Sequence, residues 1–262
     1  MRLTRFILLG MATTFATACD SDEITSDSLP PTGEVRFISG VSDAGGVDIR
    51  MIDQVDLSPV GNNLSFRAGT IYQQAEAKSR RIRVFPTSID PAVTSQVLLD
   101  TTITIQANTR ITLLLVGPSR TAGALRFVTI DDNAPAPPSG QISVRMVNIS
   151  TGAASGYVVN TTTTALPGAA TFANVGSRDA SAYVNRPSGP AALRVTETGA
   201  TVTASVAGPA APATPAGAFP AAGVTSQGSV FSAYYFPRAA TGTVTSPGIV
   251  WFVDRNPCDG GC

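Results

Sequence analysis

Residues 99–105 read LDTTITI, and their alternation decides the fold class of this chain. Apolar or β-branched side chains occupy every second position and share one face, namely Leu99, Thr101, Ile103 and Ile105. A period of two is the period of an extended strand, whose successive side chains point to opposite faces. The stretch therefore predicts a β-strand that is buried on one face.

The same alternation recurs along the chain. In residues 80–84, Ile82 and Val84 share one face, and two arginines share the other. About seven such strands fall in each ~100 residues, separated by Gly, Pro, Asn and Asp, and no amphipathic helix of useful length occurs. Charged residues make up only 14% of the chain, which favours strands and turns over helices. This pattern is typical of an immunoglobulin-like sandwich.

The chain also contains an internal repeat. Residues 33–37 (GEVRF) are echoed by residues 141–146 (QISVRM), which aligns Arg36 with Arg145. Three further segments recur in the same order: 82–84 with 193–195, 108–112 with 228–232, and 130–133 with 253–256. The offset grows from 109 to 123 residues, so the second copy carries an insertion, which falls in the Ala/Pro/Gly-rich stretch 207–223. The repeat predicts two copies of one domain.

The N-terminal segment has the composition of an export signal. Arg2 and Arg5 precede a short apolar run, residues 6–15, and small residues lead to Cys19. The run is too short to span a bilayer, which takes about 20 apolar residues. A basic start, a short apolar middle and small residues before the cut describe a secretory signal peptide. The segment resembles the lipobox of bacterial lipoproteins, in which the cysteine becomes the lipid-bearing N-terminus. Ordinary cleavage before an unmodified cysteine is the alternative.

The cysteine count agrees with lipidation. Three cysteines are present, Cys19, Cys258 and Cys262, and an odd number in an exported protein requires a role for the leftover thiol. Lipidation of Cys19 leaves an even pair, and we expect a Cys258–Cys262 disulfide in an oxidising compartment. The alternative, a metal-binding pair, lacks further ligands, because zinc takes four and the chain contains no histidine.

These observations predict an all-β chain with two tandem immunoglobulin-like antiparallel β-sandwich domains. The predicted segments are a lipoprotein signal peptide (1–18), a lipidated flexible tether (19–33), the first sandwich (34–133), a proline-rich linker (134–139), the second sandwich (140–257) and a cysteine-containing tail (258–262). The tether is assigned because its sequence is acidic and proline-containing and lacks apolar periodicity.

Three segments carry a family resemblance. Residues 35–53 (VRFISGVSDAGGVDIRMID) open with a Val-Arg strand, continue into a loop containing an aspartate and end in a Val-Asp-Ile strand. Together with residues 106–117 (QANTRITLLLVG) and 124–133 (ALRFVTIDDN), they resemble the DUF4397 family of domains of unknown function. The resemblance covers most of residues 34–133 and, more loosely, 140–256. It implies tandem domains in an exported bacterial protein, often a lipoprotein, and no established activity.

Composition excludes several function classes. Because there is no histidine, Ser-His-Asp and Cys-His catalysis are ruled out. After removal of residues 1–18 the chain carries 16 basic and 18 acidic side chains, so no clustered basic surface favours nucleic acid. Asp100 stands in a hydrophobic-Asp-Thr segment that resembles the entry of aspartic proteases, but the second copy has Thr201–Thr203 nearby and supplies no second aspartate there. We expect no catalytic residue, no cofactor and no enzyme activity.

Four aspartates, Asp43, Asp48, Asp53 and Asp56, are the alternative metal ligands in this chain. Calcium takes six to eight converging oxygens, and the spacing of these four matches no known calcium loop. We therefore expect no metal site and assign these aspartates to turns and to the solvated surface.

The densest aromatic group comprises Tyr234, Tyr235, Phe236, Trp251 and Phe252. Strand alternation places Tyr235 in the core and leaves Tyr234 and Phe236 on the opposite face. There the two rings either pack against the first domain or are candidates to face a ligand, such as a sugar.

The sequence therefore predicts a non-catalytic envelope lipoprotein, anchored to membrane lipid through Cys19 in the periplasm or at the cell surface. We expect it to act as a binding or scaffolding module for an envelope protein or a glycan. One alternative is a carbohydrate-binding or adhesion accessory protein, which requires Tyr234 or Phe236 to be exposed. A second alternative is a carboxylate-dependent hydrolase, which requires two facing Asp or Glu side chains in one cleft.

Overall fold

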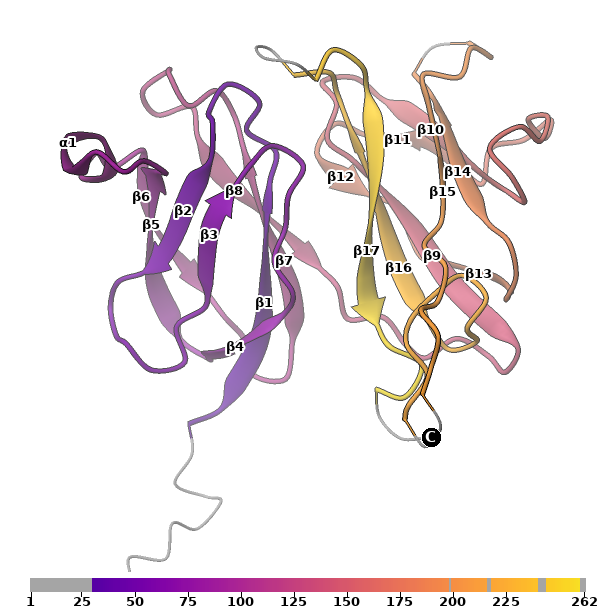
Figure 1. The fold of residues 1–262 in the computed structure, drawn as a ribbon, viewed down its shortest axis with the longest axis horizontal. Coiled ribbons are helices and arrows are strands. Elements are labelled where there is room, and N and C mark those ends of the chain that lie inside the picture. Colours follow the sequence, from indigo (N-terminus) through magenta and orange to yellow (C-terminus); the bar gives the residue numbers. More distant parts are fainter. Residues whose placement is uncertain (1–29, 198, 216–217, 240–243, 260–262) are drawn as a thin grey trace, which may run out of the picture. The chain divides into compact units, whose positions relative to one another are not determined.

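The computed structural model describes residues 30–197, 199–215, 218–239 and 244–259. In these ranges the chain is nearly all β-structure, and its only helix is the four-residue α1 (Pro91–Thr94) (Figure 1). No helix in the same ranges is long and apolar enough to cross a bilayer. The prediction of an all-β chain is confirmed.

The first eight strands form two sheets, which we call the first sheet pair. Their bounds are β1 (Thr32–Ser39), β2 (Val47–Met51), β3 (Val60–Leu64), β4 (Gln73–Glu76), β5 (Ser79–Pro86), β6 (Leu99–Thr104), β7 (Arg110–Val116) and β8 (Arg126–Asp131). One sheet has the strand order β4-β1-β7-β8, and the other has the order β3-β2-β5-β6.

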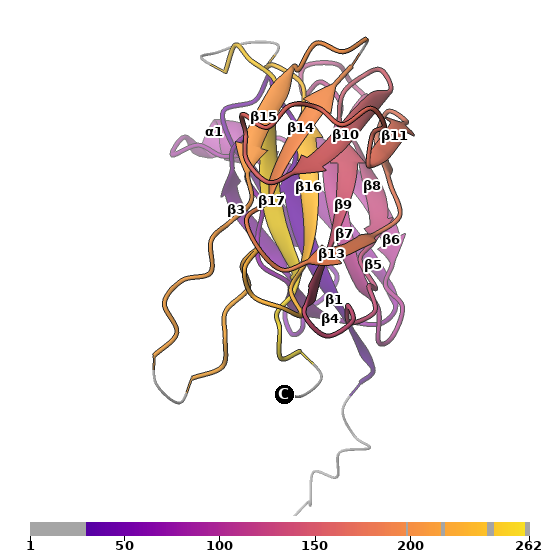
Figure 2. The same ribbon diagram turned by 90° about the vertical axis from the view of Figure 1, so that its right-hand side faces the viewer.

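The remaining strands form two further sheets, the second sheet pair. Their bounds are β9 (Gln141–Asn148), β10 (Ala154–Val159), β11 (Phe172–Val175), β12 (Asp179–Ala180), β13 (Val184–Pro187), β14 (Ala192–Thr196), β15 (Ala204–Ala207), β16 (Val230–Phe236) and β17 (Gly248–Arg255). One sheet has the order β12-β9-β16-β17, with β13 also paired to β9. The other, in front in Figure 2, has the order β11-β10-β14-β15.

The two stretches that first predicted strands are neighbours in the first sheet pair. β5 and β6 pair antiparallel, with Ile82 opposite Thr101, and every second residue of β6 is more deeply buried. On the outer face, Asp100 accepts hydrogen bonds from Arg81 and Arg83. Alternation therefore predicted both the strands and their buried face correctly.

Each sheet pair encloses an apolar core of its own. In the first sheet pair, Val35 and Phe37 on β1 are fully buried in one cluster with Val47 and Ile49 on β2. In the second, buried side chains of β9, β10, β14 and β16 form the equivalent cluster. Because the inward side chains come from both sheets, each pair has the layered arrangement of a sandwich.

The two sheet pairs share one strand connectivity. β1 runs parallel to β7, with Arg36 opposite Thr112, and β9 runs parallel to β16, with Arg145 opposite Ser232. The register therefore aligns Arg36 with Arg145, as the sequence repeat does. The prediction of purely antiparallel sheets is wrong for these two strand pairs. Parallel neighbours need a long connection, and in each copy most of the other strands lie between them in the chain.

The last strands of the two copies, β8 and β17, align with an offset that differs by one residue from that of the sequence repeat. Ile130 and Phe252 hold equivalent positions on β8 and β17, so Asp132 corresponds to Asp254. The sequence repeat instead aligns Asp131 with Asp254. The reason is a β-bulge, which leaves Asp254 without an opposite residue on β16 and shifts the register by one.

The predicted tether, residues 19–33, extends into β1. β1 begins at Thr32, and Gly33 lies opposite Ala75 on β4, so both of the last two tether residues belong to the sheet. The backbone N–H of Ala77 also donates to the carbonyl oxygen of Pro31 at 2.8 Å. Backbone pairing of this kind requires no apolar side chains, which explains why composition did not reveal it.

The predicted insertion lies in the connection between β15 and β16. This connection spans residues 208–229, whereas residues 105–109 suffice between β6 and β7. Val224, directly after the predicted insertion, is buried in the second core, and its N–H donates to the carbonyl oxygen of Pro209 within the insertion. The insertion therefore packs against the second sheet pair.

A third apolar cluster lies between the two sheet pairs. It combines Ile38, Leu114, Val116 and Ile130 of the first sheet pair with Val147, Ile149, Tyr234 and Phe236 of the second. In Figure 1 the sheets that contain β1 and β16 face each other at the centre of the drawing. β1, β7, β9 and β16 are consequently buried on both faces along most of their lengths.

We expect Phe37→Ala to lower the free energy of unfolding by about 3–5 kcal/mol, because it removes a fully buried ring and leaves a cavity. Urea unfolding followed by tryptophan fluorescence measures the change. Phe219→Ala is the control, since that ring is 77% exposed. Equal effects of the two substitutions would contradict the assignment of Phe37 to the first core.

Candidate functional site

Of the five charged side chains that are buried in the described part of the chain, four meet between the two sheet pairs. Strand alternation turns Val35 and Phe37 toward their own core, so Arg36 points to the opposite face, toward the second sheet pair. Arg145 holds the equivalent position on β9. The two arginines are 1% and 4% exposed.

Each arginine bonds to an aspartate of the other sheet pair. Arg36 Nη2 lies 2.8 Å from Asp254 Oδ1 and 3.4 Å from Asp132 Oδ2. Arg145 Nη2 donates to Asp132 Oδ1. Asp132 and Asp254 are also almost fully buried. We call these four residues the Arg–Asp network.

A hydroxyl group supports each arginine in the same way. Arg36 Nε donates to Thr112 Oγ1 at 2.9 Å, and Arg145 Nε donates to Ser232 Oγ at 2.7 Å. Each hydroxyl then donates to the aspartate of its own sheet pair. The hydroxyls therefore link every arginine to the carboxylate beside it.

A tyrosine completes each half of the arrangement. Tyr72 Oη donates to Asp132 Oδ2 at 2.7 Å, and Tyr183 Oη donates to Asp254 Oδ2 at 3.0 Å. The guanidinium carbons of Arg36 and Arg145 lie 4.5 Å and 4.4 Å from the centres of the Tyr72 and Tyr183 rings. Such stacking adds a cation–π attraction to the hydrogen bonds.

Each arginine also donates to a backbone carbonyl oxygen of the other sheet pair. Arg36 Nη1 donates to the carbonyl oxygen of Val253, and Arg145 Nη1 donates to that of Asp131. Val253 and Asp131 each precede the network aspartate of the other sheet pair. Equivalent residues of the two copies thus make reciprocal contacts, the pattern of an isologous two-fold interface formed within one chain.

Burial shapes the protonation of these groups. Burial raises the pKa of Asp132, and the nearby Arg36 opposes this effect. Burial by itself lowers the pKa of Arg36, but Tyr234, Asp254 and the other acidic groups around it raise that pKa above the usual arginine range. Burial and the charge of Asp254 raise the pKa of Tyr72, so its phenol stays protonated and donates. The protonated tyrosine and the charged arginines therefore donate to the aspartates, and these bonds hold the two sheet pairs together.

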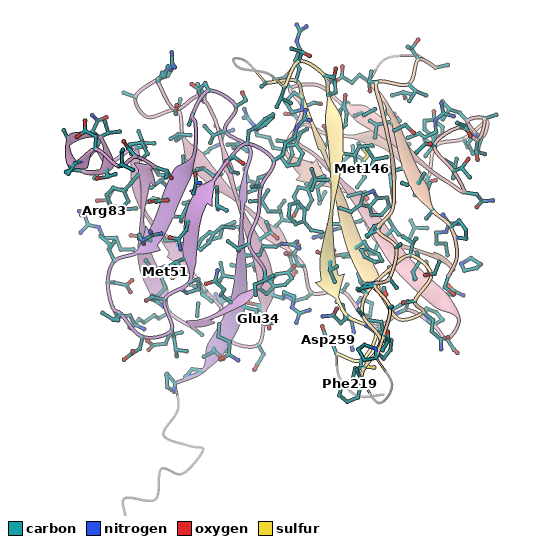
Figure 3. The ribbon with its side chains drawn as sticks, viewed as in Figure 1. Glu34, Met51, Arg83, Met146, Phe219 and Asp259 are labelled. Atoms are coloured by element: carbon teal, nitrogen blue, oxygen red, sulfur yellow. The ribbon has the colours of Figure 1, made fainter. Side chains whose placement is uncertain are left out.

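A groove lies beside the network at the edge of the junction. It consists of two recesses of about 450 and 560 Å³, which share the lining residues Glu34, Arg110, Asp254, Arg255 and Asp259. We call them together the junction groove. Figure 3 labels Glu34 on β1 and Asp259, which follows β17.

Arg110 connects the two sides of the junction groove. Its Nε lies 2.5 Å from Glu34 Oε2, and its Nη1 lies 3.5 Å from Asp259 Oδ2. The same Nη1 donates to the backbone oxygen of Asp254. Burial lowers the pKa of Arg110, but Glu34, Tyr72 and Asp259 together raise it, so the net shift is upward. Glu34 and Asp259 are therefore both paired with one cation.

The structure corrects the assignment of the two candidate aromatic residues. Tyr234 and Phe236 are both fully buried, so the prediction that they could face a ligand is wrong. The Tyr234 ring packs edge-on against Phe252 at 5.3 Å, and the Phe236 ring packs against Phe66 at 5.7 Å. The face opposite the core is covered by the other sheet pair, which is the packing alternative given by the sequence.

Tyr235 lies in the second core, as alternation predicts. Its hydroxyl group contacts Glu197 Oε1 at 2.9 Å and Thr203 Oγ1 at 3.0 Å. Burial raises the pKa of Tyr235 to about 12.

Of the three cysteines with predicted roles, only Cys258 is among the described residues. Cys19 and Cys262 lie outside the described residues, so lipidation and the Cys258–Cys262 pairing remain predictions. Cys258 follows β17 and is disulfide-bonded.

The aspartates considered as calcium ligands bond to separate partners. Asp43 accepts from the backbone N–H of Ser119 at 2.8 Å, and these backbone contacts lower its pKa although burial raises it. Asp48 accepts from Asn63 N, and Asp53 pairs with Arg80. In the described part of the chain, no group of three or more acidic or cysteine side chains is placed to hold a metal ion.

Asp100 also has a structural role. It bonds to Arg81 and Arg83 on the outer face of the first sheet pair. Hydrogen bonds from these two arginines lower its pKa well below the usual aspartate range.

The sequence contained a signal for part of the network. An arginine in the centre of a nearly apolar strand, repeated at the same place in both copies, marked Arg36 and Arg145 as a pair. Tyr72 and Tyr183 carried no such signal, because their segments show no detectable similarity. Asp132 and Asp254 were not recognised as equivalent, because the bulge shifts the sequence repeat by one residue at this point.

Comparison with known families identifies the matched part of the chain. A family model matches residues 33–158, from the start of β1 through most of β10. That family is DUF4397, a domain of unknown function. The resemblance predicted from the sequence is confirmed over these residues. The match to DUF4397 includes Arg36, Asp132 and Arg145 of the Arg–Asp network.

The comparisons with curated proteins and with solved structures give no further family assignment. Among curated proteins, none matches the chain. Among solved structures, a crystal structure of a leucine-rich repeat protein from Bacteroides thetaiotaomicron VPI-5482 shares 16% identity, with 68% of this chain and 24% of that chain covered and a TM-score of 0.20. This chain thus spans about a quarter of the length of that protein. A TM-score this low does not establish a shared fold.

We expect Arg36→Met to lower the free energy of unfolding by about 3–5 kcal/mol, because it leaves buried carboxylates without their partner. Arg83→Met is the matched control: its side chain is 34% exposed, and a surface pair contributes about 1 kcal/mol or less. Urea unfolding measures both.

The double variant Arg36→Met with Asp254→Asn separates pairing from packing. If the two groups interact, its loss of stability is smaller than the sum of the single losses. Strictly additive losses would contradict the pairing of Arg36 with Asp254.

Proposed function

We propose that this protein is a non-catalytic envelope lipoprotein in which two immunoglobulin-like sandwiches act together as one binding or scaffolding module. The observation that carries the proposal is the Arg–Asp network. Its arginines, carboxylates and tyrosines are buried and bond to one another. Groups committed in this way stabilise an arrangement of domains and are poorly placed to react with a substrate.

The immunoglobulin-like assignment rests on the sheet arrangement. In each copy two sheets enclose an apolar core, and the first strand pairs in parallel with a later central strand. The strands are short and joined by turns, which agrees with this class of sandwich.

Membrane anchoring rests on the sequence around Cys19. Twelve residues separate Cys19 from Thr32, where β1 begins. A single acyl chain gives only marginal membrane binding, whereas two chains give stable anchoring, and a diacylated cysteine would supply two. The proposal therefore assigns the module to the envelope, held near a membrane surface by its N-terminus.

The junction groove favours glycan binding as a second candidate function. The carbohydrate alternative no longer rests on Tyr234 and Phe236, which are buried. Instead, Tyr72 and Trp251 line the groove beside the polar side chains of Arg110 and Asn256. The hydrolase alternative is less favoured, because both Glu34 and Asp259 are paired with Arg110. A glycan array and an envelope pull-down with residues 20–262, each compared with Arg110→Ala, distinguish a sugar ligand from a protein ligand.

We expect the native protein to carry lipid on Cys19. Growth of the native host with an alkyne fatty acid should label the protein and bring it into the detergent phase of a Triton X-114 partition. Cys19→Ser should abolish the label and move the protein to the aqueous phase, whereas Cys258→Ser should keep the label. An intact mass that still includes residues 1–18, or an unmodified thiol on Cys19, would overturn the anchoring proposal.

A further inference from the structure

The second sheet pair contains an apolar pocket of about 280 Å³ at its lateral edge. Val144 on β9, Val158 on β10 and Phe172 on β11 line it from the core side. Val184 and Arg186 on β13 line its rim. The volume is close to the lower limit of known ligand pockets, about 300 Å³.

The equivalent edge of the first sheet pair is closed by a hydrogen-bonded pair. Gln73 on β4 accepts from the N–H of Val60 and donates to the carbonyl oxygen of Val60 on β3. This reciprocal contact ties the edges of the two sheets together.

The second copy cannot make this contact. The register places Gln73 opposite Val35, and it places Val184 opposite the equivalent Val144. By the register of the other sheets, Thr171 stands where the first copy has Val60. A valine side chain has no hydrogen-bonding group, so the edge stays untied and the pocket opens between Val184 and Thr171.

Arg186 gives the pocket a charge that is not compensated. Its Nη2 donates to Pro190 O at 3.0 Å and to Asn160 Oδ1 at 3.2 Å, and its Nη1 makes a long contact to Val159 O. These acceptors are neutral, and among the described residues Arg186 forms no salt bridge. Burial lowers the pKa of Arg186, and no neighbouring carboxylate counteracts the effect. A half-buried cation beside apolar walls favours an anion that carries an apolar chain.

We propose that this pocket binds a short-chain monocarboxylate, with the chain against Val144, Val158 and Phe172 and the carboxylate on Arg186. The volume corresponds to roughly nine waters at ~30 Å³ each, which limits the ligand to a short chain. The site is independent of the membrane anchor and of the junction groove, and it adds a small-molecule function to the proposed module.

Hexanoate and 1-hexanol are the probes that separate charge recognition from apolar binding. Titration of residues 20–262 with each, followed by methyl NMR shifts of Val144 and Val158 and by calorimetry, gives two Kd values. Hexanoate should bind about tenfold or more tightly than hexanol, since only the carboxylate pairs with Arg186. Equal affinities would overturn the proposal.

Two substitutions test the geometry. Arg186→Gln should weaken hexanoate binding about tenfold or more and leave hexanol unchanged. Val184→Gln should restore the closure seen in the first copy and abolish binding of both probes. Arg83→Gln, in the first sheet pair, is the matched control and should change neither Kd.

Thermal unfolding of each variant verifies that it is folded. Undiminished hexanoate binding by folded Val184→Gln, or shifts outside the methyls of this pocket, would contradict the site.

Discussion

Two arginines buried between two aspartates constrain how this chain is assembled. Removal of a charged group from water costs several kcal/mol, and the cost is offset only when partners are well placed. Here each arginine comes from one sheet pair and bonds to an aspartate of the other. Any other packing of these faces would leave a charge buried without its partner. The network therefore selects one arrangement, while the apolar cluster around Tyr234 and Phe236 supplies the hydrophobic contact area.

The two copies resemble each other most where they meet and differ most at their free edges. The arginine, hydroxyl, tyrosine and aspartate of one copy each have a counterpart in the other, in the same bonding role. At the lateral edge, by contrast, Gln73 is replaced by Val184, and a closed edge becomes an apolar pocket. The connection before β16 has lengthened and supplies Val224 to the second core. The shared face holds the module together, and the divergent edges provide surfaces on which the copies can differ in function.

Much of the fold followed from the sequence, and much of the site did not. Alternation of side chains predicted β5 and β6 because burial on one face is a local property of a strand. The central strands are buried on both faces, and local periodicity does not say whether a second face meets solvent, a ligand or another domain. Tyr234 and Phe236 were therefore ambiguous, and only tertiary structure resolved them. The bulge at Asp254 shifted the repeat by one residue, which no alignment of such short segments detects.

Differential scanning calorimetry of residues 20–262 tests most directly whether the shared network makes the two sheet pairs one cooperative unit. We expect a single transition whose calorimetric enthalpy equals its van't Hoff enthalpy, because neither sheet pair can separate from the other without exposing the network. Two resolved transitions, or a van't Hoff enthalpy near half the calorimetric value, would show that the sheet pairs unfold independently and would contradict this expectation.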